Sequence, residues 1–367
     1  MSSDLKHLCA LKCALTLAVL RLPASRALLL VVFSCAIYGK LRAGEIGPPL
    51  REWALTMNIP VAAIRFISGD RTVAWLSCDG HLRYWEIKYE GLGGVREVYL
   101  AGTKSERFAF ETRISLDIGA SAISSNGRMV AFTNLFPMLA VVGIESKLGK
   151  RLLAFSDVVT SVAFSADDAF LAVGLRDNSL KVFSTETWAV VHEIGSVTGE
   201  PTSVRCVAFS PKGDQYVAAS GLRRIAVGSV GNSISNIPLE GNKNRACSVL
   251  WPSENLIVTG GTDRELLVWR LRGNLQPVRL KTSLHVIDLL ASDPRGSVLA
   301  CGSTRGDSLI ELWDLKTLVS IGEVAAPRDL NCLAVSQDGG CIAAGLRSGS
   351  VIVRQVGDSR RVSSESR

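Results

Sequence analysis

Two stretches of this chain are near copies of each other: VAFSADDAFLAVG at residues 162–174 and VAFSPKGDQYVAA at residues 207–219. Each begins with a short apolar run that ends in serine. A polar turn follows, and then a second apolar run that ends in small residues. Two apolar runs on either side of a turn are typical of paired antiparallel strands. The same unit can be followed from residue 61 onward, which predicts a repeat protein built from many short strands.

A second turn and a third strand follow each copy, and their positions give the length of the repeat. Four copies place an aspartate six residues before a large aromatic side chain: Asp79 and Trp85, Asp177 and Phe183, Asp263 and Trp269, and Asp307 and Trp313. Three less regular copies keep the same spacing but lack the aspartate, and their third strands end at residues 139–141, 225–227 and 351–353. The aligned turn positions are residues 79, 136, 177, 222, 263, 307 and 348.

A period in the low forties with about four strands per unit is typical of a propeller blade. With the dipeptide Trp313-Asp314, the chain resembles the WD-repeat family over residues 50–357. The resemblance implies an all-β fold, a seven-bladed β-propeller of four-stranded antiparallel blades. We expect the turn aspartates to accept local hydrogen bonds and the aromatic side chains to fill the space between sheets. No Gly-His dipeptide precedes the blades, so we expect the family's Asp-His-Ser-Trp network to be incomplete.

Ring closure should use the start of the repeat region, because an open ring would leave an unpaired edge strand. The resemblance implies that the last blade takes its outer strand from the N-terminal side of the first. Residues 51–57 (REWALTM) have the right place, and little sequence follows Val353. The first repeat also holds about 14 extra residues within 88–115, where we expect a loop at Gly91–Gly94 and a strand at 95–100. This insertion is either a tolerated surface loop or a binding element.

The first 44 residues form a separate basic and apolar leader, for which we expect a short helix. Residues 27–39 are an apolar run that is too short to cross a bilayer as a helix, and extending it to residues 14–39 includes Arg21, Pro23 and Arg26. A signal peptide or signal anchor fits this pattern, and we expect membrane association through it. The alternatives are an organellar targeting sequence, a lipoprotein signal cleaved before Cys35, and a misassigned start codon or a helix packed on the ring, with a cytoplasmic protein.

The distribution of charge and the motifs that the sequence contains restrict the classes of partner and activity that we expect. Of the net charge of +7, residues 1–51 carry +5 and residues 359–367 carry +2. The latter belong to a polar tail that begins at residue 358 and that we expect to be disordered. The remaining body is neutral, so we expect no nucleic-acid partner. The nine cysteines form no CxxC pair and the four histidines are scattered, so we expect no metal site. We also find no catalytic motif, and therefore predict no catalytic residue, no cofactor and no small-molecule substrate.

One regularity points to a binding surface. By family analogy, the loop between the second and third strands of a blade lies at the mouth of the central channel. In five repeats this loop carries arginine: Arg176, Arg223 with Arg224, Arg264, Arg305 and Arg347. These side chains either form a ring for acidic or phosphorylated protein segments or simply solvate polar turns. The sequence predicts a non-catalytic protein-binding scaffold; the alternative is a ligand sensor or enzyme that uses the channel.

Overall fold

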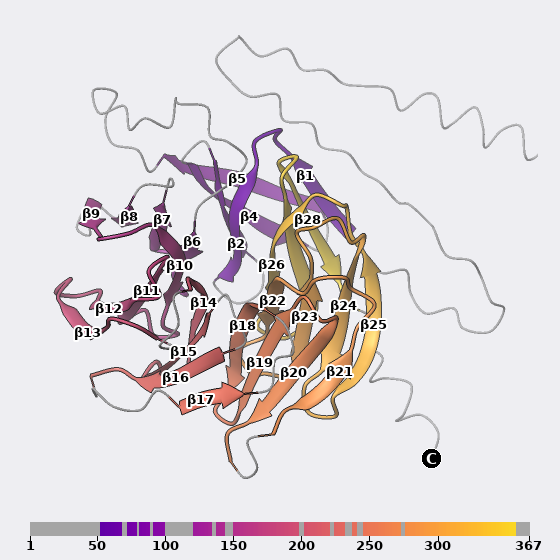
Figure 1. Cartoon of the computed structure of the whole chain (residues 1–367). Coiled ribbons are helices and arrows are strands. Elements are labelled where there is room, and N and C mark those ends of the chain that lie inside the picture. Colours follow the sequence, from indigo (N-terminus) through magenta and orange to yellow (C-terminus); the bar gives the residue numbers. More distant parts are fainter. Residues whose placement is uncertain are drawn as a thin grey trace, which may run out of the picture.

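The computed structural model describes residues 52–67, 72–78, 81–88, 91–99, 120–133, 137–143, 150–197, 202–220, 224–231, 237–240, 245–272 and 276–356. These residues form seven four-stranded antiparallel sheets that are arranged as blades around a central axis (Figure 1). The prediction of an all-β, seven-bladed propeller is confirmed.

The strands follow in chain order. Blade 1 holds β2 (Val61–Ile67), β3 (Thr72–Ser77), β4 (His81–Lys88) and β5 (Gly91–Tyr99). Blade 2 holds β6 (Ser121–Ile123), β7 (Met129–Thr133), β8 (Met138–Gly143) and β9 (Lys150–Ala154). Blade 3 holds β10 (Val159–Phe164), β11 (Phe170–Leu175), β12 (Leu180–Ser184) and β13 (Val190–Ile194). Blade 4 holds β14 (Val204–Phe209), β15 (Gln215–Ser220), β16 (Arg224–Ser229) and β17 (Ile237–Glu240).

The other three blades complete the ring. Blade 5 holds β18 (Ala246–Ser253), β19 (Leu256–Gly261), β20 (Glu265–Arg270) and β21 (Val278–Lys281). Blade 6 holds β22 (Leu289–Ser292), β23 (Val298–Gly302), β24 (Leu309–Asp314) and β25 (Val319–Ala325). Blade 7 holds β26 (Leu330–Val335), β27 (Cys341–Leu346) and β28 (Ser350–Gln355), and takes β1 (Glu52–Thr56) as its outer strand.

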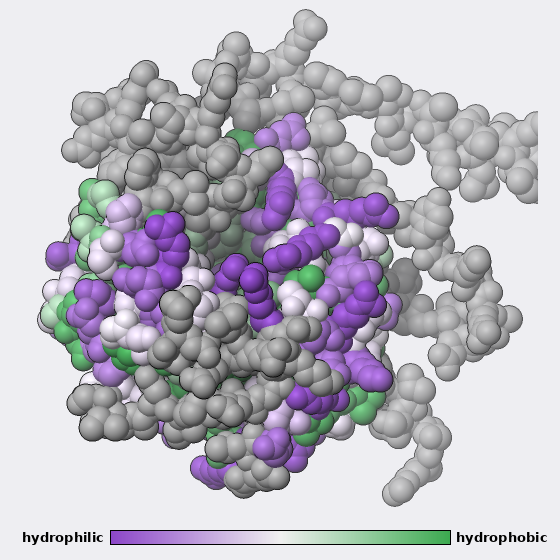
Figure 2. Space-filling view, viewed as in Figure 1, coloured by the Kyte–Doolittle hydropathy of each residue, from purple (hydrophilic) through white to green (hydrophobic). Residues whose placement is uncertain are grey.

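The first strand of each blade lies nearest the axis, so seven inner strands surround a central channel (Figure 1). Antiparallel order places the first-to-second and third-to-fourth strand turns at one end of every blade, which we call the bottom face. The second-to-third strand turns and the connections between blades lie at the other end, the top face. In Figure 2, hydrophilic side chains border the described part of the central opening.

The serine that ends the first strand holds the bottom turn together. Ser165 Oγ donates to Asp167 Oδ1 at 2.6 Å and accepts from the backbone N–H of Phe170 at 2.9 Å. Ser336 repeats both bonds, with Asp338 at 2.6 Å and with the Cys341 N–H at 2.8 Å. A short polar side chain at this position thus satisfies backbone donors that the turn would otherwise leave unpaired.

Ring closure takes place between β1 and β28, as the sequence predicts. The two strands pair antiparallel, with Trp53 opposite Val353 and Leu55 opposite Val351. The Arg354 Nε donates to Glu52 Oε2 at 2.6 Å near one end of the pair. At the other end the backbone N–H of Met57 donates to the Gly349 carbonyl at 3.1 Å. The edge of the last blade is therefore covered by a strand from the start of the ring.

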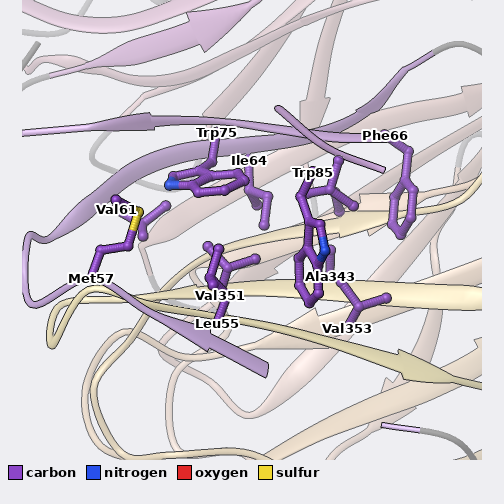
Figure 3. Packing of buried hydrophobic residues seen from close by; sticks show 12 residues of the cluster. Leu55, Met57, Val61, Ile64, Phe66, Trp75, Trp85, Ala343, Val351 and Val353 are labelled. Carbon is purple, nitrogen blue, oxygen red and sulfur yellow. The ribbon is translucent and has the colours of Figure 1, made fainter. Parts of the chain in front are cut away.

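Buried apolar side chains fill the space between the first and last blades (Figure 3). Leu55 from β1 and Val351 and Val353 from β28 face Trp75 and Trp85 of blade 1, and all five are at most 3% exposed. Aromatic side chains of this size bury large apolar areas and so dominate the energetics of such an interface. The N-terminal strand therefore contributes core packing as well as backbone pairing.

The bottom turns of blades 1, 2 and 3 are joined by a polar contact. Asp168 is 7% exposed and accepts the backbone N–H groups of Ser125 at 2.6 Å and Asn126 at 2.9 Å. Arg65 of blade 1 donates to Ser125 Oγ at 2.8 Å and to the Ile123 carbonyl at 3.3 Å. One carboxylate and one guanidinium thus fix three adjacent blades relative to one another.

The N-terminal helix and the C-terminal tail lie outside the described residues. The predicted membrane localisation is contradicted: every regular element described is a strand, and within these residues no helix is long and apolar enough to cross a bilayer. The loop predicted at Gly91–Gly94 is also wrong, because these glycines begin β5, where Leu92 pairs with Ile87 of β4.

Leu55→Ala should lower the free energy of unfolding by about 2–5 kcal/mol, because it leaves a cavity in the closure core. Leu152→Ala removes the same atoms from a side chain that is 48% exposed and should cost less than about 0.5 kcal/mol. Urea denaturation of the two variants measures the difference. Equal losses would show that the β1 strand does not pack as described.

Asp168→Asn should cost about 1–3 kcal/mol, because the buried charge facing Arg65 is lost while an N–H group is placed against backbone donors. Asn tolerates the positive φ of 61° at this position, so backbone strain is not introduced. Asp167→Asn changes the exposed neighbour and should cost less than about 1 kcal/mol. Thermal unfolding checks the pair, and an Asp168 variant as stable as the Asp167 variant would contradict the contact.

Candidate functional site

The central channel widens into a cavity of about 320 Å³ whose wall is formed by residues of all seven inner-strand segments. Most wall residues are small or apolar, including Ala62, Ala122 and Ala163. Two charged side chains reach this wall, Arg65 and Asp288. Arg65 is held by the bonds described above, and Asp288 accepts the N–H and Oγ of Thr304, both at 2.7 Å. The charged groups of the channel are thus already satisfied by the protein itself.

The cysteines of the wall are packing residues. Burial raises the pKa of the Cys332 thiol to about 12 and also raises the pKa of the Cys206 thiol. Both therefore stay protonated at neutral pH and are poor nucleophiles. Over the residues that the structure describes, no group of three or more histidine, cysteine, aspartate or glutamate side chains is placed to hold a metal ion.

Four of the six predicted arginines have described side chains, and all four are exposed in top-face loops: Arg176, Arg264, Arg305 and Arg347. The structure does not describe Arg223, and Arg224 begins β16 but its side chain is not described. The loops are fixed against the inner strand of the same blade, since the N–H of Arg347 donates to the Asp329 carbonyl at 2.9 Å. The arginines are therefore held on rigid turns around the channel mouth.

Three of these arginines contact a polar side chain of their own blade. Arg176 Nη2 lies 2.7 Å from Asp157 Oδ1, and Arg305 Nε lies 3.6 Å from Asp288 Oδ2. Arg347 Nε donates to Asn331 Oδ1 at 3.3 Å. The guanidinium groups stand outside their partners: the side chain of Arg176 is 64% exposed against 23% for Asp157, and that of Arg305 is 59% exposed against 15% for Asp288. At the rim of the channel mouth, the exposed guanidinium groups of Arg176 and Arg305 thus lie above recessed carboxylates, those of Asp157 and Asp288.

Two aspartates of the top-face loops, Asp157 and Asp307, are ionised at neutral pH. The backbone N–H of Val158 and the guanidinium of Arg176 hold the pKa of Asp157 below its usual value. At Asp307 burial raises the pKa, but hydrogen bonds from the side chain and backbone N–H of His285 outweigh burial and leave the pKa lowered. Each aspartate can therefore orient a neighbouring cation or donor over the normal pH range.

The repeat aromatics lie in the core, as expected from their spacing. Trp85, Phe183, Trp269 and Trp313 are at most 8% exposed. Of the turn aspartates, Asp177 accepts the Ser179 N–H at 2.9 Å, Asp307 accepts the His285 N–H at 2.9 Å, and Asp263 has one buried oxygen without a partner in the described chain. Asp79 lies outside the described residues.

The family's hydrogen-bond network is divided between two blades. In blade 5 the indole of Trp269 donates to Thr259 Oγ1 at 3.2 Å, and in blade 6 His285 Nδ1 lies 2.7 Å from Asp307 Oδ1. In blade 6, Cys301 occupies the strand position that Thr259 has in blade 5. The indole N–H of Trp313 instead donates to Glu311 Oε2 at 3.3 Å. Neither blade contains all four groups.

Two further arginines at the channel mouth do not belong to the second-to-third strand turns, so the sequence search missed them. Arg205 lies at the bulge of β14, and Arg245 immediately precedes β18; both are exposed. Burial raises the pKa of the Cys247 thiol, while the charges of Arg305, Arg205 and Arg245 oppose this rise. Arg205, Arg245 and Arg305, from blades 4, 5 and 6, therefore all lie within electrostatic range of the Cys247 thiol.

Comparison with known proteins agrees with the geometry. Residues 148–184, which contain the last strand of blade 2 and three strands of blade 3, match the family described as WD domain, G-beta repeat. The chain is 25% identical to WD repeat-containing protein slp1 of Schizosaccharomyces pombe over 183 residues, 48% of this chain and 36% of slp1. It is 25% identical to actin-interacting protein 1 of Caenorhabditis elegans, over 70% of this chain and 47% of that protein.

A third relative is the APC/C activator protein CDC20 of Saccharomyces cerevisiae, which is 24% identical over 45% of this chain and 27% of its own length. The matched region spans less than half the length of each of these relatives. Blade number, strand order, the matched repeat and the relatives together confirm the resemblance: the chain is a seven-bladed β-propeller that is similar to WD-repeat proteins.

Proposed function

We propose that this protein is a non-catalytic platform that binds a carboxylate- or phosphate-bearing segment of a partner protein at the top face. The observation that carries this proposal is the arrangement of exposed guanidinium groups above recessed carboxylates at the channel mouth. The nitrogen atoms that face solvent remain able to bind a second, incoming anion. Because Arg176 and Arg305 are already paired with carboxylates of their own blades, part of the side-chain entropy cost of ordering them is met before a partner binds.

This surface includes blades 4, 5 and 6, where Arg205, Arg245 and Arg305 all lie within electrostatic range of Cys247. Arg305 touches its carboxylate through Nε, which leaves the two terminal nitrogens of the fork for a partner. The names of two relatives, an activator of the APC/C and an actin-interacting protein, are consistent with an interaction function for propellers of this type.

A ligand sensor or enzyme that uses the channel has one observation in its favour, the cavity of about 320 Å³. That volume is at the lower end of the range for small-molecule sites. Its wall, however, presents small and apolar side chains, and its charged groups, Arg65 and Asp288, already have protein partners. The channel is therefore less suited to catalysis or ligand sensing than the top-face rim is to binding a partner protein.

The double variant Arg205→Gln with Arg305→Gln should reduce partner capture at least about tenfold, because two charge-assisted contacts are removed. Glutamine avoids placing a new carboxylate beside Asp288. The control, Lys212→Gln with Lys281→Gln, makes the same charge change on the bottom face and on an outer strand. Quantitative affinity purification should show proteins that the wild type and the control retain and the rim variant loses. Retention of the same proteins by all three would contradict the proposal.

A further inference from the structure

A groove on the bottom face lies between blades 5 and 6, far from the top-face rim in each blade. It has a volume of about 550 Å³ and is lined by the first turn of each of the two blades and by the ends of β20 and β24. Four of its lining residues are cationic and exposed: Arg270, Arg272, Arg295 and Lys316. Among the described residues that line it, none is acidic.

The cations of this groove differ from those of the rim, because none of the four forms an ion pair with another described residue. The nearest acidic residues along the chain are engaged elsewhere. Asp293 is fully buried and accepts the N–H groups of Ser297 and Val298. Asp314 Oδ1 accepts the backbone N–H groups of Lys316 and Thr317, and Glu254 pairs with Lys212 at 3.3 Å. Four like charges are thus gathered without internal compensation.

The fold holds these like charges together. Arg270 is fixed opposite Leu256 by the pairing of β19 with β20. Gly296 has a φ of 61°, and a Cβ atom there would lie 2.5 Å from the Pro252 carbonyl oxygen, so only glycine lets the blade 6 turn approach the blade 5 turn this closely. Arg295 thereby lines the same groove as Ser253 and Asn255 of the neighbouring blade. Uncompensated repulsion at such a site favours the binding of an anion.

We propose that this groove binds a polyanionic peptide segment, with at least two phosphate or carboxylate groups, of a partner protein. Arginine forks suit both groups, and Ser253 and Asn255 add hydroxyl and amide donors. A membrane surface fits less well, because none of the exposed large apolar side chains described lines the groove. Nucleic acid fits less well because the groove has no aromatic residue on which bases could stack.

The test uses the full chain and a fluorescein-labelled peptide with two phosphoserines separated by one glycine, measured by fluorescence anisotropy. Arg272→Gln with Arg295→Gln should weaken binding at least about tenfold. Arg272→Lys with Arg295→Lys keeps the charge but loses the forks and should give a smaller loss. The matched control is Lys212→Gln with Lys281→Gln, which makes the same charge change at residues that do not line the groove and should stay within about twofold of wild type. The rim variant, Arg205→Gln with Arg305→Gln, is measured alongside: a loss in the rim variant without a loss in the groove variant would place the peptide on the top face and overturn the groove proposal, which does not depend on the top-face proposal.

Comparison peptides define the ligand. The twin with glutamates in place of phosphoserines should bind more weakly, and the twin with plain serines should bind at least about tenfold more weakly. Equal losses in the groove variant and the lysine control, or equal binding of the plain serine peptide, would overturn the proposal. Binding of vesicles that contain phosphatidylinositol phosphates without binding of the phosphopeptide would also overturn it, in favour of a lipid surface. Because all substituted side chains are exposed, unchanged thermal unfolding verifies that the variants are folded.

Discussion

The pairing of β1 with β28 is the interaction on which the rest of the ring depends. Each blade buries its two faces against its neighbours, so an incomplete ring would expose two apolar faces and one strand edge. The chain solves this by taking one strand from its N-terminal side and joining it to its last blade. Leu55 and Trp85, which come from opposite sides of the seam, then share one core. Both faces of the propeller are defined only once this seam is closed.

Closure also explains why the two faces can carry different chemistry. The apolar interior is supplied by the strands, so the turns at either end are free to vary in sequence. On the top face, arginines stand over carboxylates of the same blade, as in Arg176 above Asp157. In the bottom groove between blades 5 and 6, Arg272 and Arg295 have no such partner in the described chain. The first surface favours discrete contacts, and the second favours a ligand with several negative charges.

Much of the fold could be predicted from the sequence, because its signals are local and repeated. A serine, a polar turn and an aromatic at fixed spacing identify the blades, and the need to cover the edge strand of the ring predicts the strand supplied by residues 51–57. The error at Gly91–Gly94 arose because glycine usually marks a turn, whereas here it begins an outer strand paired with β4. Membrane association was inferred from residues 14–39 alone, and no described element supports it.

The candidate sites were less predictable, because they depend on contacts between distant residues. The rim arginines could be found in their turns, but not the aspartates that lie beneath them. Arg205 was missed because it sits at a strand bulge and not in a turn. The groove residues run from Arg270 to Lys316, and only the packing of two blades brings them to one place.

The most direct test of ring closure compares a chain that begins at residue 52 with one that begins at residue 58. Hydrogen exchange followed by mass spectrometry reports on the backbone amides of β28. With β1 present, these amides should be protected; without it, those that face β1 should exchange quickly and the ring should unfold at a lower temperature. Equal protection and equal melting of the two chains would contradict closure by the N-terminal strand.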